Sequence, residues 1–203
     1  MLTSGGLASI PMIPWRRVLP TAFLLLAMTA CSGGQTSTSG SSSAPDANTA
    51  GDIPDSQAFV PYNASSGLFT VSVPEGWSRA SDGDAVVFSD KLNSVRVEQH
   101  AASAAPTVDS LRSDELPAIR SAAKGFQEGK VEATSRKAGP AVVVTYAAES
   151  AANQVTGKTV VQDVERYEFF HNGQEVVLTL SAPQGADNVD PWRTVTDSLS
   201  WSQ

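Results

Sequence analysis

The side chains of this sequence that are best suited to chemistry are one cysteine, Cys31, and two histidines, His100 and His171. Glu98 stands two residues before His100 in the run VRVEQH, so their side chains share one face of a predicted strand. A divalent metal can use such a pair, but zinc sites need three or four ligands. His171 lies in a predicted turn, where we expect it to be solvated. The histidines therefore predict neither a metal site nor a catalytic site.

Acidic residues gather at two further places in the sequence. Asp82, Asp84 and Asp90 flank a predicted hairpin in SDGDAVVFSD, where Asp and Gly suit a turn and the spacing is not that of an EF-hand. The second group lies along one predicted strand and consists of Asp163, Glu165, Arg166 and Glu168. We interpret this group as the solvent-exposed side of the strand.

The sequence carries none of the local motifs that mark common catalytic or nucleotide-binding sites. It has no Gly-x-Ser-x-Gly nucleophile elbow. It also has no Walker loop and no dinucleotide-binding fingerprint. A triad that assembles only in space is not visible in a sequence. We therefore predict no catalytic residue, no metal ligand and no cofactor, and the ligand-binding residues stay unknown.

The lone cysteine follows a segment typical of a signal peptide. Residues 1–30 carry two arginines, no acidic residue and an apolar run that is too short to cross a bilayer. The sequence MTAC at 28–31 resembles a bacterial lipobox, although Met28 stands where Leu is usual. This resemblance implies that a diacylglyceryl group is attached to Cys31 and that the chain is cut before it. The alternative is an ordinary secretory signal with an incidental cysteine.

The chemistry of the thiol favours the lipid interpretation. A free, exposed thiol is reactive in an oxidising compartment, and a thioether removes that reactivity. Each buried acyl CH₂ contributes about 0.8 kcal/mol, so two chains anchor a protein where one does not. The pair Arg16-Arg17 leaves Sec export and twin-arginine export both open.

A polar segment at residues 31–57 predicts a flexible linker. Ser, Gly, Thr and Ala dominate it, and large apolar residues are nearly absent. About 26 such residues reach roughly 25–30 Å. We expect the linker to add nothing to the core; whether it is glycosylated stays open. Without residues 1–30 the chain has 12 basic and 21 acidic residues, a formal charge of −9, which argues against a nucleic-acid partner.

Residues 58–203 are long enough to form one domain with its own core. Apolar and polar residues alternate from Phe69 to Val73 and in several later runs, which predicts strands. The pair Asn172-Gly173 predicts a tight hairpin. The residues predicted to form the core are Phe69, Val71, Val73, Val144, Leu178 and Trp192. We also expect Trp77 and Trp201 to be core or end-cap residues.

Helical spacing appears twice in this domain. In the first helix Thr107 can cap the start, and either a second helix begins at Ser113 with Pro117 in its first turn or the helix kinks at Pro117. In the final helix, we expect Asp190 to cap and Pro191 to take the first position. The predicted order is β-β-β-α-β-β-β-β-α. It indicates an α+β fold with a single antiparallel sheet flanked by helices.

The opening FTVSVPEGW, the hairpin after it, the mid-chain helix and the final PWRTVTDSLSW resemble the PsbP-like α/β/α sandwich. This superfamily includes actinobacterial lipoproteins of the LpqN type, and the resemblance covers the chain from about Phe59 onward. It implies a non-enzymatic accessory or binding protein of the cell envelope, and the lipobox-like motif at Cys31 implies a lipid anchor on the extracytoplasmic face of the cell membrane. The implied partner is an envelope protein or a hydrophobic ligand. The alternatives are a carrier of a lipid or other hydrophobic molecule in a sheet–helix cavity and a small envelope hydrolase.

Replacement of the cysteine tests the predicted anchor. Cys31→Ala removes the only thiol that can carry the lipid, so the variant should move from the membrane fraction to the soluble or secreted fraction. Cell fractionation followed by immunoblotting measures this distribution. If the variant stays as membrane-bound as the wild type, the lipobox interpretation is wrong.

Overall fold

The computed structural model describes residues 50–202. Cys31, the predicted signal peptide and the predicted linker up to residue 49 lie outside the described residues, so what the sequence indicates for them stays a prediction. In chain order the elements are β1 (Phe59–Asn63), β2 (Phe69–Pro74), β3 (Ser78–Asp82), β4 (Ala85–Asp90), β5 (Asn93–Ala101), α1 (Val108–Ser110), the π-helix η1 (Leu111–Glu115), α2 (Leu116–Ala122), β6 (Gln127–Arg136), β7 (Gly139–Glu149), β8 (Val161–His171), β9 (Gln174–Pro183), α3 (Val189–Asp197) and β10 (Ser200–Trp201).

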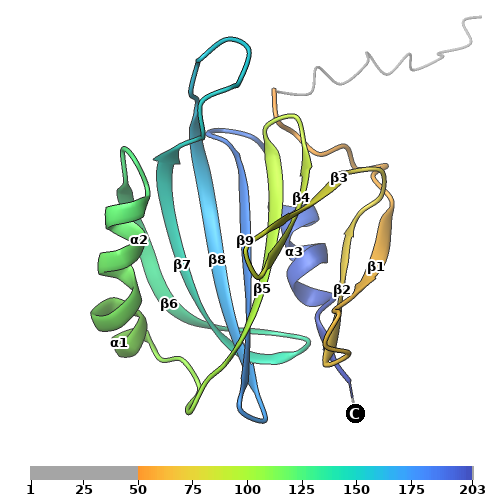
Figure 1. Ribbon diagram of the computed structural model, residues 1–203, viewed down its shortest axis with the longest axis vertical. Helices are drawn as coiled ribbons and strands as arrows, with labels where there is room; N and C mark the ends of the chain where they lie inside the picture. Colours follow the sequence, from red (N-terminus) through yellow and green to blue (C-terminus); the bar gives the residue numbers. More distant parts are fainter. Residues whose placement is uncertain (1–49, 203) are drawn as a thin grey trace, which may run out of the picture. The chain divides into compact units, whose positions relative to one another are not determined.

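Seven antiparallel strands form the main sheet, in the order β3-β4-β5-β9-β8-β7-β6 (Figure 1). Strands β6 to β9 form an up-and-down meander, and β9 then pairs with β5 from Ser94 opposite Ser181 to Ala101 opposite Gln174. Strands β1, β2 and β10 form a smaller antiparallel sheet. The predicted α+β class with an antiparallel main sheet is confirmed. The smaller sheet was not predicted.

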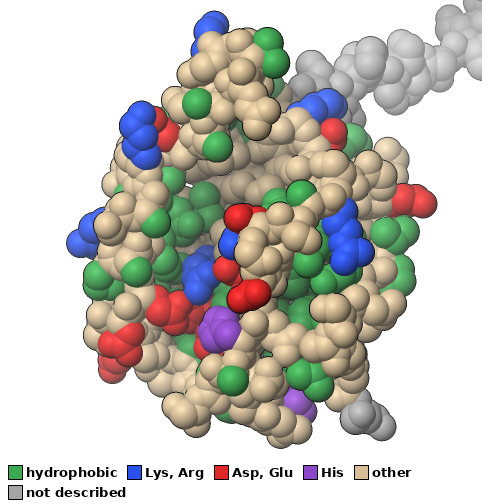
Figure 2. Space-filling view, in the orientation of Figure 1, with side chains coloured by type: hydrophobic (Ala, Val, Ile, Leu, Met, Phe, Trp, Pro, Cys, Tyr) green, Lys and Arg blue, Asp and Glu red, His purple; other side chains and the backbone are tan. Residues whose placement is uncertain are grey.

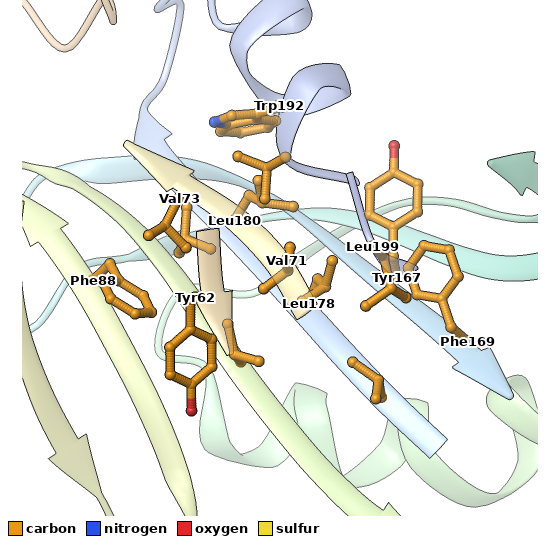
Figure 3. Packing of buried hydrophobic residues seen from close by; sticks show 14 of the residues in the cluster. Tyr62, Val71, Val73, Phe88, Tyr167, Phe169, Leu178, Leu180, Trp192 and Leu199 are labelled. Atoms are coloured by element: carbon orange, nitrogen blue, oxygen red, sulfur yellow. The ribbon is translucent and has the colours of Figure 1, made fainter. Parts of the chain in front are cut away.

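One face of the main sheet packs against β2 and α3 and forms the larger core (Figure 3). Alternation along β9 turns Val176, Leu178 and Leu180 toward this core. Trp77 and Trp201 are partly buried at its margin. The residues predicted to form the core are all at most 8% exposed: Phe69, Val71, Val73, Val144, Leu178 and Trp192.

The other face of the main sheet is covered only in part. The helical segment from α1 to α2 packs Leu111 and Leu116 onto Val131 of β6 and onto Val142 and Val144 of β7. β7 is therefore apolar on both faces at its centre, as predicted. Beside this cover, β5, β9 and β8 present a polar surface that we call the open face. Its side chains are Arg96, Glu98, His100, Arg166, Glu168, Glu175, Thr179 and Ser181.

Three strands were not predicted from the sequence. β3 is exposed at all five positions, so its sequence SRASD has no apolar alternation to mark it. β1 contains Pro61, which is uncommon in strands, and β10 has only two residues. All three lie at sheet edges, where pairing with a neighbouring strand holds them without an apolar pattern.

A π-helical segment divides the mid-chain helix. Thr107 caps α1 through a capping box, and Pro117 lies in the first turn of α2, as predicted. α2 begins at Leu116 instead of Ser113, because the five residues before it form η1 and end at Glu115. π-helical turns are rare in proteins, and many of those that occur lie at functional sites.

Asn188 accounts for two further differences from the sequence predictions. It holds the N-cap position of α3, for which the sequence predicted Asp190, and its side chain does not cap the helix. Its Oδ1 accepts a hydrogen bond from the Ile53 backbone N–H at 2.7 Å, and its Nδ2 donates to the Gly51 carbonyl at 3.0 Å. Ile53 is 6% exposed and belongs to the larger core. The structure thus packs residues 51–53, part of the predicted linker, onto the domain.

Removal of this segment should therefore destabilise the domain. A chain that begins at residue 58 is expected to melt at a lower temperature than one that begins at residue 50, because it lacks Ile53 and both hydrogen bonds to Asn188. Truncation of a buried aliphatic side chain to Ala costs about 2–5 kcal/mol, which gives the scale of the effect. Thermal unfolding followed by circular dichroism measures the difference.

Two glycines supply a matched control for this packing. Gly51 and Gly67 have φ angles of 104° and 72°, so alanine strains the backbone at both positions. A Cβ on Gly51 would lie 2.5 Å from Pro183 Cδ, whereas nothing lies within 4 Å of a Cβ on Gly67. Gly51→Ala should therefore lower the melting temperature more than Gly67→Ala. Equal melting temperatures, in this pair and in the truncation pair, would contradict the packing of residues 51–53.

Candidate functional site

The open face carries polar side chains in register on three neighbouring strands. Pairing of β5 with β9 sets His100 opposite Glu175 and Glu98 opposite Val177. Pairing of β9 with β8 sets Val177 opposite Glu168. Glu98 and Glu168 therefore flank Val177 across three strands, and Glu175 lies two residues further along β9 on the same face.

Arg166 lies at the centre of this arrangement and binds three carboxylates. Its Nε lies 3.1 Å from Glu168 Oε1, its Nη2 lies 2.7 Å from Glu115 Oε2 on η1, and its Nη1 lies 3.5 Å from Glu98 Oε2. Only 16% of the Arg166 side chain is exposed. Figure 2 shows acidic, basic and histidine side chains gathered near the middle of this face. We call Arg166, Glu98, Glu115, Glu168 and Glu175 the Arg166 cluster.

Glu168 is the most buried member of the Arg166 cluster. Its side chain has no exposed surface, and its Oε2 has no hydrogen-bond partner. Burial raises the pKa of Glu168 to about 8, and the neighbouring carboxyl of Glu115 acts in the same direction, while the charge of Arg166 opposes the shift. The carboxyl of Glu168 therefore retains a proton near neutral pH.

Glu175 is the second buried carboxyl without a full set of partners. It is 6% exposed, its Oε2 lies 3.3 Å from His100 Nε2, and its Oε1 has no hydrogen-bond partner. Burial raises the pKa of Glu175, and His100 opposes the shift. One oxygen each of Glu115, Glu168 and Glu175 lie within 4.8 Å of one another. Carboxylates gathered this closely need protons or a cation between them.

Glu98 and His100, which the sequence placed on one face, contact different partners in the structure. Both lie on the open face, as predicted, but Glu98 binds Arg96 and Arg166. His100 contacts Glu175 on the neighbouring strand instead. The two side chains therefore face different partners and do not form a common metal-binding pair.

The interpretation of Glu168 as part of a solvent-exposed strand side is wrong. Alternate residues of β8 point to opposite faces of the sheet, so Glu168 and Glu165 are separated. Glu165 accepts a hydrogen bond from Tyr167 Oη at 2.7 Å, on the side of the larger core. Glu168 is instead buried, because it lies between β7 and β9 and contacts Glu115 of η1. The alternation VERYEF is visible in the sequence, but the cover over one face is not.

The other candidate residues lie apart from the Arg166 cluster. Asp82 pairs with Arg96, and Asp84 and Asp90 are exposed. His171 is exposed, as expected, and stacks on the tryptophan of β10 with 5.2 Å between ring centroids. Within residues 50–202, neither histidine hydrogen-bonds a serine or threonine hydroxyl, so neither is arranged to activate such a nucleophile.

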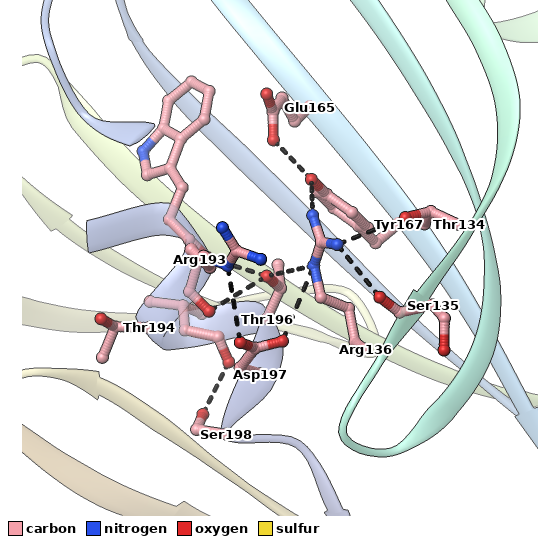
Figure 4. A network of polar contacts seen from close by, with 12 residues as sticks. Thr134, Ser135, Arg136, Glu165, Tyr167, Arg193, Thr194, Thr196, Asp197 and Ser198 are labelled. Atoms are coloured by element: carbon pink, nitrogen blue, oxygen red, sulfur yellow. Dashed lines mark hydrogen bonds and ion pairs between the residues drawn. The ribbon is translucent and has the colours of Figure 1, made fainter. Parts of the chain in front are cut away.

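A second polar network joins α3 to the opposite face of the sheet (Figure 4). Arg136 donates to Thr196 Oγ1 at 3.1 Å and to Tyr167 Oη at 2.7 Å, and Tyr167 in turn donates to Glu165. Burial and the nearby Glu165 raise the pKa of Tyr167 to about 12. Each of these side chains has a partner, so the network fastens the helix to the sheet and leaves no group for a ligand.

A hollow of about 510 Å³ lies on the open face beside the end of α2 and the loop between β7 and β8. Its walls are mainly small or polar side chains, among them Ala122, Thr159, Gln162, Thr179 and Ser181. Pockets for hydrophobic ligands are lined mostly by large aliphatic and aromatic side chains. The hollow is therefore a poor match to a lipid cavity.

The sequence matches no family model and no curated protein. The solution structure of cyanobacterial PsbP (CyanoP) from Synechocystis sp. PCC 6803 is similar, with a TM-score of 0.50 and 15% sequence identity, over 77% of this chain and 99% of that chain. The chain has a PsbP-like fold.

Two further structures resemble this PsbP-like chain more weakly. LpqN, involved in cell envelope biogenesis of Mycobacterium tuberculosis, has a TM-score of 0.41 and 13% identity, over 73% of this chain and 93% of that chain. A Bacteroides thetaiotaomicron protein has a TM-score of 0.46 and 13% identity over 70% of this chain. The match covers about half (48%) of the length of the Bacteroides protein. None of the helices formed by residues 50–202 is both long and apolar enough to cross a membrane.

Glu168 should make the PsbP-like domain less stable as the pH rises. The folded chain keeps a proton up to about pH 8, whereas an unfolded chain loses it near the ordinary Glu pKa of about 4.3. The contribution of the protonated Glu168 to the free energy of unfolding is thus complete below about pH 4.3 and disappears as the pH passes about 8. Urea unfolding without divalent ions should show the unfolding free energy falling by up to about 1.4 kcal/mol per pH unit in that range.

Glu168→Gln keeps the shape of the side chain and removes its titration. The free energy of unfolding of this variant should therefore fall less steeply with pH, with the contribution of Glu175, whose pKa is also raised, remaining. Glu132→Gln, at an exposed position of β6, is the matched control and should retain the wild-type slope. A wild-type slope in Glu168→Gln would show that this carboxyl is ionised in the folded protein.

Proposed function

We propose that this chain is a lipid-anchored, extracytoplasmic accessory protein that binds a partner protein through its open face. The observation that carries the proposal is the unequal cover of the main sheet. One face is closed by β2 and α3, while on the other face β5 and part of β8 and β9 stay partly accessible beside α2. A charged sheet face that the chain itself does not close can meet a partner of complementary charge.

The charge of the open face favours a partner with basic side chains. Glu98 and Glu115 of the Arg166 cluster are each about one third exposed, at 30% and 35%, and Asp82 at the margin is 72% exposed. The mature chain as a whole is also acidic. Complementary charge accelerates encounter and selects among partners more than it adds affinity.

The predicted tether supports a contact at the membrane. A lipid on Cys31 and a linker would keep the domain near any partner held at the same membrane, at an effective concentration on the order of mM. A contact that is weak in dilute solution would then be occupied. The PsbP-like fold is compatible with an accessory role. LpqN, which is involved in cell envelope biogenesis, resembles this chain weakly.

The two alternative functions have less support from the described residues. The hollow beside α2 is walled by small and polar side chains, which does not favour a carrier of hydrophobic molecules. The histidines lie beside Glu175 and Asn172, an arrangement that does not favour a hydrolase with a serine or threonine nucleophile.

Cysteine-directed photocrosslinking in intact cells tests the proposed surface. A lipidated Cys31 is a thioether, so one introduced cysteine would be the only reactive thiol. Ala122→Cys and Thr159→Cys place it at two exposed positions on the rim of the hollow, and Thr194→Cys places it on the exposed side of α3 as a control. Both rim variants should yield the same discrete product with an envelope protein, and the control should not.

The tether is tested in the same assay by adding Cys31→Ala. This change should lower the yield of the rim product several-fold while the fold stays intact. Absence of a rim product, or an equal product from Thr194→Cys, would rule out the open face as the docking surface. An unchanged yield without Cys31 would show that the tether does not serve the contact.

A further inference from the structure

Three carboxyl groups of the Arg166 cluster converge, and two of them carry a buried oxygen without a hydrogen-bond partner. Glu115 comes from η1, Glu168 from β8 and Glu175 from β9, and one oxygen of each lies within 4.8 Å of the others. Glu168 Oε2 and Glu175 Oε1 are buried and have no hydrogen-bond partner. Buried polar atoms are nearly always partnered, so two neighbouring exceptions point to a missing ligand.

The opposite oxygens of the same carboxyls are held in place. Arg166 contacts Glu168 Oε1 at 3.1 Å and Glu115 Oε2 at 2.7 Å, and His100 Nε2 lies 3.3 Å from Glu175 Oε2. Groups that hold the outer atoms of carboxylates in this way orient metal ligands in known sites. Glu168 and Glu175 are thus each held through one oxygen, and the second oxygen of each is buried without a hydrogen-bond partner.

The burial of the two unpartnered oxygens limits the kind of ligand that can reach them. The two unpartnered oxygens are buried, so a water molecule or a partner's ammonium group does not reach them in this arrangement. A bare metal ion approaches carboxylate oxygens to about 2.3–2.6 Å, closer than the roughly 2.7–3.2 Å of a hydrogen bond. Three oxygens within 4.8 Å of one another can surround such an ion.

The charge of the site also suits a divalent cation. The three carboxylates and the guanidinium of Arg166 sum to −2 when all are ionised, and Glu98 shares Arg96 with Asp82. All the converging donors are oxygens, which zinc and copper do not prefer. Ca²⁺ accepts irregular sets of oxygen ligands, whereas Mg²⁺ demands near-ideal octahedral geometry.

We propose that Glu115, Glu168 and Glu175 form a binding site for one Ca²⁺ ion. Water completes the coordination from the side of Glu115, which is 35% exposed. The bound ion links η1 to β8 and β9 and so fixes the helical segment to the centre of the main sheet. The sequence predicted no metal site, because two of the ligands are far apart along the chain from the third. The inference does not depend on the partner suggested under the proposed function.

Direct titration with Ca²⁺ tests the site. The full chain is freed of metal with a chelator, dialysed, and titrated with Ca²⁺ by isothermal calorimetry and by thermal unfolding. We expect one ion per chain, with a dissociation constant on the order of 10⁻⁴–10⁻³ M, as in extracellular modules. The melting temperature should rise with the concentration of Ca²⁺, because the ion binds the folded chain.

Three ligand variants and one control distinguish this site from adventitious binding at other acidic residues. Glu168→Gln, Glu175→Gln and Glu115→Gln should each weaken Ca²⁺ binding at least tenfold, and Glu132→Gln on exposed β6 should leave it unchanged. Glu115→Gln alters the most exposed ligand, so it decides the test if a buried variant does not fold. No Ca²⁺ binding by the wild type up to about 10 mM, or binding that all folded ligand variants retain, would overturn the proposal.

Discussion

The pairing of β5 with β9 is the constraint on which the rest of this structure depends. It joins an N-terminal group of strands to the β6–β9 meander over eight residue pairs, from Ser94 opposite Ser181 to Ala101 opposite Gln174. On one face it sets Val95 opposite Leu180 in the larger core, and on the other it sets His100 opposite Glu175. Because the period of a strand is two, a slip of one residue would exchange these faces and bury the charges in the apolar core. The register therefore determines both the packing and the site.

The Arg166 cluster is costly to bury, and its composition reflects that cost. Removing an ionised carboxylate from water costs several kcal/mol unless partners compensate, and Glu168 has no exposed surface. Arg166 compensates by binding Glu168, Glu115 and Glu98 at once, and a proton on Glu168 removes part of the repulsion. Through Arg166 of β8 and Glu98 of β5, the network also connects η1 to β8 and β5, which the apolar contacts of the helical segment do not reach. A cluster with this many acids and so few cations is a poor device for stability alone, which agrees with a role in binding.

Parts of the fold could be predicted because they are encoded by neighbouring residues. Alternation identified β2, β5 and β9, Asn172-Gly173 identified the β8–β9 turn, and Thr107 capped α1 as expected. The edge strand β3 escaped prediction because exposure at all its positions leaves no apolar pattern. The role of Ile53 was also not predicted, because a single apolar residue in a polar run is typical of a linker. Only the contact with Asn188, far along the chain, shows that Ile53 packs on the domain. For the site, alternation placed Glu98 and His100 on one face but could not identify their partners.

The sequence by itself determined the local elements, the apolar faces of the strands and the lipobox-like motif at Cys31, because each depends on residues within one turn or one strand. Only the tertiary structure decided which strands are neighbours and which polar side chains become buried. Glu168 shows the difference: its alternation with Tyr167 places it on one face of β8, but the cover by η1 and the pairing with β7 and β9 bury that position. Burial, and with it the raised pKa and the unpartnered oxygen, is a property of what packs over a residue, and those contacts are long-range.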